Sequence, residues 1–287
     1  MAILNHKIDF VVLVSVDMTN ANGDPLNGNR PRMTYDGCGE MSDVCIKRKI
    51  RNRMQDLGQR VFVQSDDRCD DGCTSLKNRA DSVPELKEIN NKGKKATFTD
   101  KDDYSRIACD RWIDVRSFGQ VFAFGNISVG VRGPVSIHPA QSVSPIDVYS
   151  MQITKSVNSE DGDKKGSDTM GSKHFVRYGL YTIKGSINVQ LAEKTGFSEE
   201  DAEVLKECLR TLFVNDASSA RPDGSMEVVK VYWFEHNCKT GQYSSAQVHR
   251  SVKASLKDDV SAPSSPDDYN ITLDCLDGLT PEEIPGV

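Results

Sequence analysis

The chain has 287 residues, with 36 Lys and Arg against 42 Asp and Glu, and 37% of its residues are hydrophobic. A chain of this length can bury about 70–75% of the surface that its unfolded form exposes, so it needs no disulfide staples. The composition excludes a collagen, a wholly disordered chain and a disulfide-rich mini-protein. The apolar run Phe10 to Val14 is too short to span a bilayer and follows no secretory signal, which predicts a soluble cytoplasmic protein without a membrane partner.

Charge is unevenly distributed along the chain. From Ala254 to Val287 there are one base and eight acids, a net −7, which leaves +1 for the preceding 253 residues. Between Asn27 and Phe62 the local charge is +4. The negative net charge of the whole chain therefore does not exclude a basic groove on one face. The acidic, proline-containing segment 254–287 is predicted to be a tether or a solvated extension, docked at most in part around Ile271–Leu276.

The first predicted strand is Ile8–Met18, which is β-branched and apolar enough to be buried on both faces. It leads into a loop, Thr19–Arg32, that is rich in Asn, Gly and Pro and so in turn chemistry. Ser42 is a good N-cap for a following helix. The apolar stripe of that helix has a 3.6-residue period and consists of Ile46, Ile50, Met54 and Leu57.

The middle of the chain is less regular. Asp66–Asp103 has mixed charge and no clear period, which predicts an insertion with some helix of its own. Strands are predicted again around Ile127–Ile137. The stretch Asn158–Gly166 is too polar to pack, which indicates a projecting hairpin or a disordered tip.

The second half repeats the strand–helix–strand pattern. A long strand is predicted over Arg177–Leu191, a helix opens at the capping box of Ser198–Asp201, and another buried strand covers Met226–Phe234. Strand, helix, strands, helix, strand is the order of a ferredoxin-like fold. The sequence therefore predicts an α+β protein built on the ferredoxin-like palm of RRM domains, with insertions.

Catalytic and metal-binding motifs are not evident. The eight cysteines and five histidines lack zinc-ligand spacing, and cytosolic thiols of this kind stay reduced. Nucleotide-binding glycine loops, nucleophile elbows and zinc deaminase signatures are missing from the sequence. We therefore expect no metal, no cofactor and no catalysis. Asp17 and Asp24 keep one alternative open, metal-dependent phosphodiester cleavage, although a strand-end cap and an Asp-Pro turn are the favoured interpretations.

Basic residues point instead to nucleic acid. The span Ile46–Gln55 contains five bases and no acid, whereas a merely solvated helix normally mixes both signs. Guanidinium and ammonium groups neutralise phosphates, and Asn side chains supply directional bonds to sugars. The aromatic pair with which RRM domains stack bases is missing, since Ser117–Phe122 resembles it only faintly. We therefore expect contact with the RNA backbone rather than recognition of a base sequence.

Four sequence blocks together resemble a known family. They are Asn20–Arg32, Asp114–Gly119, Gly130–Ser136 and Phe175–Tyr181. They resemble the type I-C (Csd-type) CRISPR Cascade backbone subunit, of the Cas-seven family in the RAMP superfamily. The resemblance covers most of the first 215 residues.

The resemblance implies a modified RRM palm over 1–253, interrupted by a finger-like insertion at about 62–108 and a thumb hairpin at about 150–177, with 254–287 as an acidic extension. Copies of such a subunit polymerise helically along one crRNA and present it for pairing with target DNA in antiviral defence. Type I relatives do not cut. They work with a crRNA-processing subunit, large and small subunits and a recruited helicase-nuclease. Type III relatives do cut RNA, with an Asp in the loop after the first strand, so a metal-dependent endoribonuclease is the alternative.

The guide contacts fall on the asparagine-rich loop, the basic helix, two short blocks and the thumb. The implied RNA-binding residues are Asn20, Asn22, Asn27, Asn29, Arg30, Arg32, Lys47, Lys49, Arg51, Arg53, Ser117, Phe118, Gln120, Arg132, Met170, Lys173, His174, Phe175 and Arg177. Separately, three ammonium groups around one flexible Gly predict a stripe that attracts target duplex DNA, formed by Lys92, Lys94 and Lys95.

Overall fold

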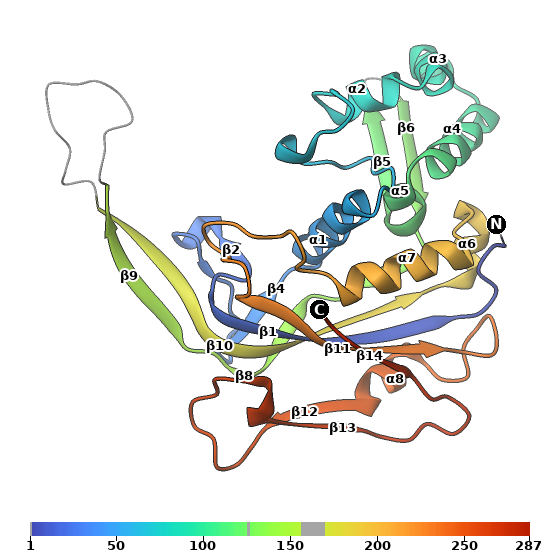
Figure 1. Cartoon of the computed structure of the whole chain (residues 1–287). Coiled ribbons are helices and arrows are strands. Elements are labelled where there is room, and N and C mark those ends of the chain that lie inside the picture. The colour runs from blue at the N-terminus through green and yellow to red at the C-terminus, as the bar shows by residue number, and fades with distance from the viewer. Residues whose placement is uncertain (1, 125–126, 156–169) are drawn as a thin grey trace, which may run out of the picture.

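The computed structural model describes residues 2–124, 127–155 and 170–287. Its centre is an antiparallel sheet with helices on one face and a smaller pair of strands on the other, and a long hairpin projects from one end (Figure 1). A helical lobe rises above the sheet at the other end (Figure 1). The predicted mixture of helix and sheet is confirmed. The predicted polar tip Asn158–Gly166 lies outside the described residues.

The elements follow the chain in this order. The strands are β1 (Ile8–Thr19), β2 (Gly23–Asp24), β3 (Arg30–Pro31), β4 (Cys38–Met41), β5 (Gly119–Phe124), β6 (Ile127–Arg132), β7 (Val135–Ile137), β8 (Ala140–Pro145), β9 (Val148–Thr154), β10 (Met170–Ile187), β11 (Met226–Glu235), β12 (Val252–Leu256), β13 (Tyr269–Leu273) and β14 (Glu282–Pro285). The helices are α1 (Asp43–Asp56), α2 (Leu76–Asp81), α3 (Pro84–Lys92), α4 (Phe98–Arg111), α5 (Ile113–Phe118), α6 (Val189–Thr195), α7 (Glu199–Arg210) and α8 (Ser245–Ser251). Single turns are η1 (Pro25–Asn27), η2 (Asp66–Arg68), η3 (Gly93–Lys95) and η4 (Pro266–Asp268).

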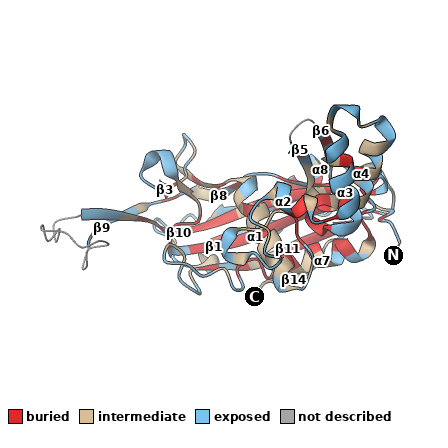
Figure 2. Cartoon of the chain, turned by 90° about the horizontal axis from the view of Figure 1, so that it is seen from above, coloured by how far each residue is buried: buried red, intermediate tan, exposed pale blue. Residues whose placement is uncertain are grey.

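The central sheet has the strand order β14-β11-β1-β10-β8-β4. β1 pairs antiparallel with both β10 and β11, and the side chains from Ile8 to Val16 are buried. Figure 2 shows this buried band running through the middle of the molecule. A strand with neighbours on both sides and layers on both faces needs a nearly continuous apolar sequence, so the predicted central strand is confirmed.

Helices α1 and α7 cover one face of the sheet (Figure 1). Ile46, Ile50 and Met54 are fully buried on α1, as the periodicity predicted. The Ser42 hydroxyl accepts from the Cys45 N–H at 3.3 Å. α7 opens with the predicted capping box, because Ser198 and Asp201 bond reciprocally through side chain and backbone. The local signals of both helices therefore agree with their packing.

Two boundaries differ from the sequence prediction. The predicted strand was Arg177–Leu191, whereas β10 begins at Met170 and ends at Ile187. Asn188 Oδ1 accepts from the Leu191 N–H at 2.9 Å, which caps α6 and ends the strand. The apolar alternation beyond Ile187 therefore belongs to a helix.

Part of the acidic segment packs on the fold, and the predicted docking around Ile271–Leu276 is confirmed, whereas most other residues of 254–287 are half-buried or exposed. β12 and β13 pair, and with α8 they cover the sheet face opposite α1 and α7. Tyr269 and Leu279 are 4% and 3% exposed. β14 pairs with the outer edge of β11, where Glu282 and Glu283 meet Lys206 and Lys230 at 3.0 and 2.9 Å. In β13 the exposed Asn270 and Thr272 alternate with Tyr269, Ile271 and Leu273, which are buried or half-buried, and the net charge of the segment does not reveal this pattern.

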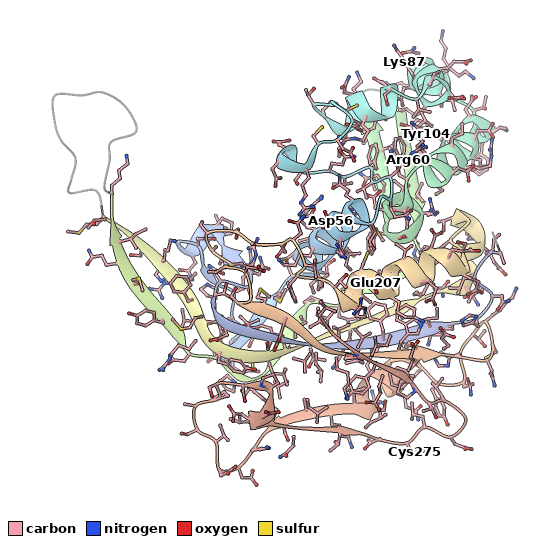
Figure 3. All side chains as sticks on the ribbon, viewed as in Figure 1. Asp56, Arg60, Lys87, Tyr104, Glu207 and Cys275 are labelled. Atoms are coloured by element: carbon pink, nitrogen blue, oxygen red, sulfur yellow. The ribbon has the colours of Figure 1, made fainter. Side chains whose placement is uncertain are left out.

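A second hydrophobic cluster fills the helical lobe of α2 to α5 with β5 and β6. It runs from Phe62 to Val129, beyond the predicted insertion boundary at 108. Phe62 lies 4.7 Å from the Trp112 ring and 5.1 Å from the Phe122 ring, between ring centroids. In Figure 3, Lys87 marks the outer end of this lobe, and Cys275 marks the opposite end of the molecule. The lobe therefore has a core of its own.

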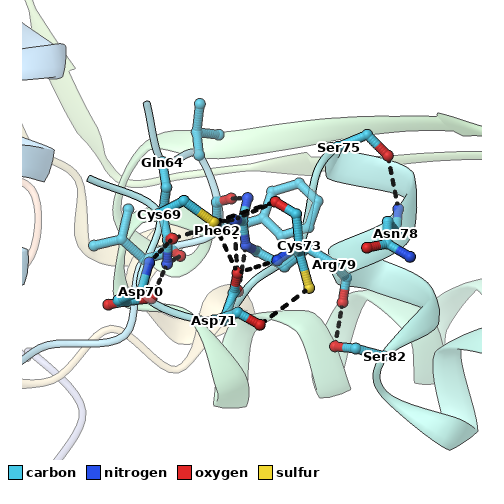
Figure 4. A network of polar contacts seen from close by, with 12 residues as sticks. Phe62, Gln64, Cys69, Asp70, Asp71, Cys73, Ser75, Asn78, Arg79 and Ser82 are labelled. Carbon is cyan, nitrogen blue, oxygen red and sulfur yellow. Dashed lines mark hydrogen bonds and ion pairs between the residues drawn. The ribbon is translucent and has the colours of Figure 1, made fainter. Parts of the chain in front are cut away.

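Arg79 organises the loop that leads into this lobe (Figure 4). Its side chain is 4% exposed, and its guanidinium holds the Asp71 carboxylate with contacts of 2.5 and 2.9 Å. It also donates to the carbonyl oxygen of Phe62 at 2.9 Å and to Gln64 Oε1 at 3.1 Å. The hydrogen bond from Arg79 holds the pKa of Asp71 well below its usual range. One buried cation thus ties the Cys69–Cys73 loop to the lobe.

This depressed pKa predicts an acid-sensitive contribution to stability. The favourable charge on Asp71 is fully present above the ordinary Asp pKa of about 3.9 and is lost as the pH falls towards the lower folded-state value. We expect Asp71→Asn to lower the free energy of unfolding at pH 6 and to flatten its decline below pH 4. Urea unfolding across that range measures both effects. Asp66→Asn, an exposed carboxylate on the same segment, serves as control and should leave the acid profile of the wild type unchanged.

Three further properties concern the described part of the chain. Its helices are too short or too polar to cross a bilayer. Its His, Cys, Asp and Glu side chains do not gather in groups of three or more that could hold a metal ion. All eight cysteines lie within it and are free thiols.

Candidate nucleic-acid interface

The asparagine-rich loop after β1 is shaped by its own amides. Asn20 is 4% exposed and donates from Nδ2 to the Asn29 carbonyl oxygen at 2.7 Å. Asn22 Oδ1 accepts from the N–H and the hydroxyl of Ser42 at 2.9 and 3.0 Å. Asn29 has a positive φ of 56°, which Asn tolerates better than most residues. Asn20 and Asn22 therefore hold the loop against the start of α1.

The outer part of the loop faces solvent. Asn27, Asn29 and Arg30 are exposed, and Arg32 is half-buried with its guanidinium 3.6 Å from the Asp24 carboxylate. Asn27, Arg30 and Arg32 line one cavity of about 200 Å³. Amide and guanidinium groups can bond the phosphate and sugar oxygens of a nucleic-acid strand, although here they share the cavity with the carboxylates of Asp24 and Glu40. The structure thus brings together three of the residues that the sequence assigned to RNA.

The bases of helix α1 are less available than the sequence suggested, because four of them pair with carboxylates. Two of these carboxylates lie at the ends of α1, and two come from distant parts of the chain. The pairs are Lys47–Asp43 (3.1 Å), Arg51–Asp114 (2.9 Å), Arg53–Asp56 (3.6 Å) and Lys49–Asp216. Arg53 also donates from Nε to the Thr211 hydroxyl at 2.7 Å. A phosphate would have to compete with these carboxylates, so a freely available basic stripe along α1 is not what the structure presents.

Lys49 is the clearest correction. Its side chain is 3% exposed, and its ammonium lies 5.3 Å from the centroid of the Phe213 ring and in contact with the Asp216 carboxylate. Burial lowers the pKa of Lys49, and the charge of Asp216 opposes that shift. Lys49 follows Ile46 by one helical turn and so shares its buried face. The prediction that Lys49 binds a phosphate is therefore wrong.

Lys49 instead supports a loop that the sequence analysis did not single out, Phe213–Ser225. The Ala220 carbonyl oxygen in this loop accepts from the Thr19 hydroxyl at 2.7 Å and from the Asn20 N–H at 3.1 Å. The Ser219 carbonyl oxygen accepts from Lys173 Nζ at 3.4 Å. The loop therefore connects the asparagine-rich loop to the hairpin. Its sequence signal is the turn pattern Arg221-Pro222-Asp223-Gly224.

This geometry predicts how Lys49 variants behave. Lys49→Met leaves the Asp216 carboxylate without its buried cation and should lower the free energy of unfolding by about 3 kcal/mol. The double variant Lys49→Met with Asp216→Leu should recover most of that loss, because the one charge that then lacks its partner, Arg221, is 30% exposed and can be solvated. Urea unfolding measures both. Lys47→Met, which breaks a more exposed pair, should cost at most about 1 kcal/mol. A double variant no more stable than Lys49→Met alone would contradict this role.

The block around Phe118 presents a ring and two cations. Lys47 Nζ lies 5.9 Å and the Arg51 guanidinium carbon 5.1 Å from the centroid of the half-buried Phe118 ring. Ser117 is fully buried, and its hydroxyl donates to the Ile113 carbonyl oxygen at 2.6 Å. The Ser117 hydroxyl is therefore committed to its own helix and is not exposed for the predicted contact with RNA.

The neighbouring pair β5–β6 carries the remaining two predicted contacts of this region. Gln120 is half-buried and donates from Nε2 to the Val121 carbonyl oxygen at 3.1 Å. Arg132 is exposed and lies opposite Gly119 in the ladder. Arg132 is therefore available to a phosphate, whereas Gln120 is partly committed to the backbone.

The hairpin β9–β10 carries the other predicted contacts at different depths. Met170 is 66% exposed, and Arg177 is exposed with its guanidinium 3.5 Å from the Asp147 carboxylate. Phe175 is half-buried. His174 is only 9% exposed, and its Nδ1 lies 2.9 Å from the Ser150 hydroxyl oxygen. His174 therefore packs within the hairpin stem, and its role as a guide contact of the thumb stays a prediction.

The predicted DNA-attracting lysines lie on the helical lobe, at and just after the end of α3. Lys92 Nζ donates to Asp100 Oδ1 at 2.7 Å, and this bond raises the pKa of Lys92 and lowers that of Asp100 to about 2. Lys94 and Lys95 are exposed in η3. The stripe therefore offers two exposed ammonium groups and one that is paired.

The two carboxylates of the nuclease alternative have different surroundings. Asp24 Oδ1 accepts from the Leu26 N–H at 3.2 Å and lies 3.6 Å from Arg32, which is the structural role of a turn residue. Asp17 is exposed and lines, with Asp147 and Arg177, a cavity of about 540 Å³. Asp24 thus stabilises the turn of its loop. Of the two carboxylates, only Asp17 lines the cavity of about 540 Å³.

Comparisons with known proteins converge on one family. Residues 6–274 match the family profile described as "CRISPR-associated protein Cas7". The chain is 25% identical over 228 residues to the "CRISPR-associated protein Cas7" of Haloferax volcanii, across 72% of this chain and 64% of that protein. The match thus spans less than two thirds of that relative's length.

Solved structures add a shared fold. A chain of a "CRISPR RNA-guided surveillance complex, pre-nicking" aligns with a TM-score of 0.53 at 16% identity, over 89% of this chain and 84% of that one. A chain of a second "CRISPR RNA-guided surveillance complex" aligns with a TM-score of 0.45 at 17% identity, over 79% and 68%. The second score is too low to add to the comparison.

Proposed function

The chain belongs to the Cas7 family of CRISPR-associated proteins, and from this membership we propose that it is a crRNA-binding backbone subunit of a Cascade surveillance complex. The observation that carries the proposal is the family match over residues 6–274. The solvent-facing cavity of Asn27, Arg30 and Arg32 supports it, because these groups suit the backbone of a single strand.

The proposed palm is of the RRM type. The strands β11, β1 and β10 are adjacent in the sheet, with α1 and α7 on one face, which is the core arrangement of a ferredoxin-like fold. The helical lobe would be the finger-like insertion, and the hairpin β9–β10 would be the thumb. The root of the hairpin meets the asparagine-rich loop through Phe213–Ser225, which supports a guide path across this junction.

Several copies would polymerise along one crRNA and present it for pairing with target DNA. The exposed apolar side chains of β9 support contact with a neighbouring copy, since they have nothing in their own chain to cover them among the described residues. Lys94 and Lys95 would attract the target duplex without sequence preference. The four sequence blocks support the type I-C branch, with a crRNA-processing subunit, large and small subunits and a recruited helicase-nuclease as partners.

Purification tests the proposal directly. The chain expressed with a CRISPR array should carry RNA of uniform length, seen as an absorbance shifted towards 260 nm and a single band after extraction. Arg30→Ala with Arg132→Ala should weaken the binding of all RNA sequences equally and lower the salt slope by about 0.7 for each lost phosphate contact. A purified chain free of RNA would contradict the proposal. Mg²⁺-dependent RNA cleavage that Asp17→Asn abolishes would favour the nuclease alternative.

A further inference from the structure

A second, smaller cavity lies beside the asparagine-rich loop, at the root of the hairpin. Its volume is about 120 Å³, and three separate segments wall it. These are the loop after β1, through Asn20 and Asn29, the strand β10, through Ser172–Phe175, and the loop before β11, through Ser219 and Ala220. Hydrogen bonds tie these segments together, from the Asn20 N–H to the Ala220 carbonyl oxygen and from Lys173 to that of Ser219.

Asn20 is one of the lining residues, and its side chain has an enclosed acceptor that is not used. Its Nδ2 donates to the Asn29 carbonyl oxygen at 2.7 Å, which fixes the orientation of the amide because a carbonyl oxygen can only accept. The Asn20 Oδ1 is buried and finds no hydrogen-bond partner within 2–124, 127–155 or 170–287. Buried acceptors without a donor are rare and destabilising until a donor reaches them. Asn20 is therefore prepared for a ligand that donates a hydrogen bond.

The other groups of the cavity indicate which ligand this is. Lys173 supplies an ammonium group, which suits a phosphate, and the half-buried Phe175 ring offers a surface for a base. An acceptor beside these two groups is matched by the sugar hydroxyl between the phosphate and the base. RNA has this hydroxyl at the 2′ position and DNA lacks it.

We propose that this cavity binds one nucleotide of the guide and that Asn20 Oδ1 accepts a hydrogen bond from its ribose 2′-hydroxyl, which makes the chain select RNA over DNA. The inference rests on the proposed function, since it assumes that a single strand crosses this junction. Because Asn20 Oδ1 is enclosed in the unbound chain, the proposal requires side chains that line the cavity to shift when the nucleotide binds.

Three oligonucleotides of one sequence test the proposal on the full chain: single-stranded RNA, its 2′-deoxy form and its 2′-O-methyl form. The 2′-O-methyl strand keeps the RNA sugar conformation but cannot donate a hydrogen bond. We expect the wild type to bind RNA about tenfold more tightly than either of the others by fluorescence anisotropy. Asn20→Ala should lose about tenfold in RNA affinity and keep its DNA affinity, which erases the preference. Asp110→Ala, which changes an exposed side chain on α4 outside both cavities, should leave the ratio unchanged.

Each outcome decides a different question. Equal binding of all three strands by the wild type, or an RNA preference that survives in Asn20→Ala, overturns the inference while the proposed function stands. Failure to bind any strand overturns the proposed function and the inference together. If Asn20→Ala does not fold, the wild-type comparison of RNA with its 2′-O-methyl form decides alone, because it needs no variant.

Discussion

Replacing Tyr149, Met151 and Ile153 together with Ser should leave a folded chain that binds guide RNA but no longer assembles along it. These side chains alternate along β9 and share one face of the hairpin. They are 45%, 41% and 38% exposed, so the core of the chain does not depend on them. Across the ladder they face Phe175, Lys173 and Gly171, which continue the same face onto β10.

The magnitude of this effect follows from the area that a neighbouring copy would cover. Fully burying one such side chain is worth about 1.5–3 kcal/mol, and because less than half of each is still exposed, the three together contribute about 2–4 kcal/mol. Their loss should weaken the contact between copies by about 30- to 1,000-fold. Native mass spectrometry of the chain with guide RNA should then show single copies in place of a defined multimer.

A matched variant separates the apolar face from the strand itself. Gln152→Ser with Thr154→Ser changes two exposed residues on the other face of β9 and should assemble as the wild type does. Multimers of wild-type length from the triple variant would show that the hairpin is not the contact between copies, and the assignment of the hairpin as thumb would then fail.

The elements that the sequence predicted well are those whose signal is local. β1 has an unbroken apolar run, and α1 and α7 combine a 3.6-residue stripe with a cap in the preceding residue. In these elements the periodicity, the cap and the packing agree. The end of β10 was misplaced because a single side chain, Asn188, turns an apolar alternation into the start of a helix.

The site was predicted less completely, because two of the ion pairs that occupy the bases of α1 join residues far apart in the sequence. Lys49 and Asp216 are 167 residues apart, and Arg51 and Asp114 are 63 apart. Periodicity placed these bases on a helix but could not show which carboxylates the fold brings to them. In the acidic segment 254–287 the strand β13 was not predicted. The net charge of the segment is a strong signal, whereas the alternation of Tyr269–Leu273 covers only five residues.

The second large effect concerns Asp114, a carboxylate that links the helical lobe to helix α1. Asp114 is fully buried at the start of α5, and it accepts from the N–H groups of Phe62 and Val63 at 2.7 and 3.1 Å. It also accepts from Arg51 Nε at 2.9 Å. One side chain thus satisfies two backbone donors of the lobe and one guanidinium of α1.

Asp114→Ala should therefore lower the free energy of unfolding by about 3–5 kcal/mol, because it leaves Arg51 partly buried without its anion and two N–H groups without an acceptor. Asp114→Asn keeps one acceptor oxygen but not the charge, so its loss should be smaller. Urea unfolding measures both. Asp110→Ala removes a side chain that is 70% exposed on the neighbouring helix α4 and should stay within about 0.5 kcal/mol of the wild type. If Asp114→Ala loses no more stability than this control, the lobe is held to the sheet layer by its other contacts, which include the Arg116–Asp201 ion pair at 2.7 Å, rather than by this carboxylate.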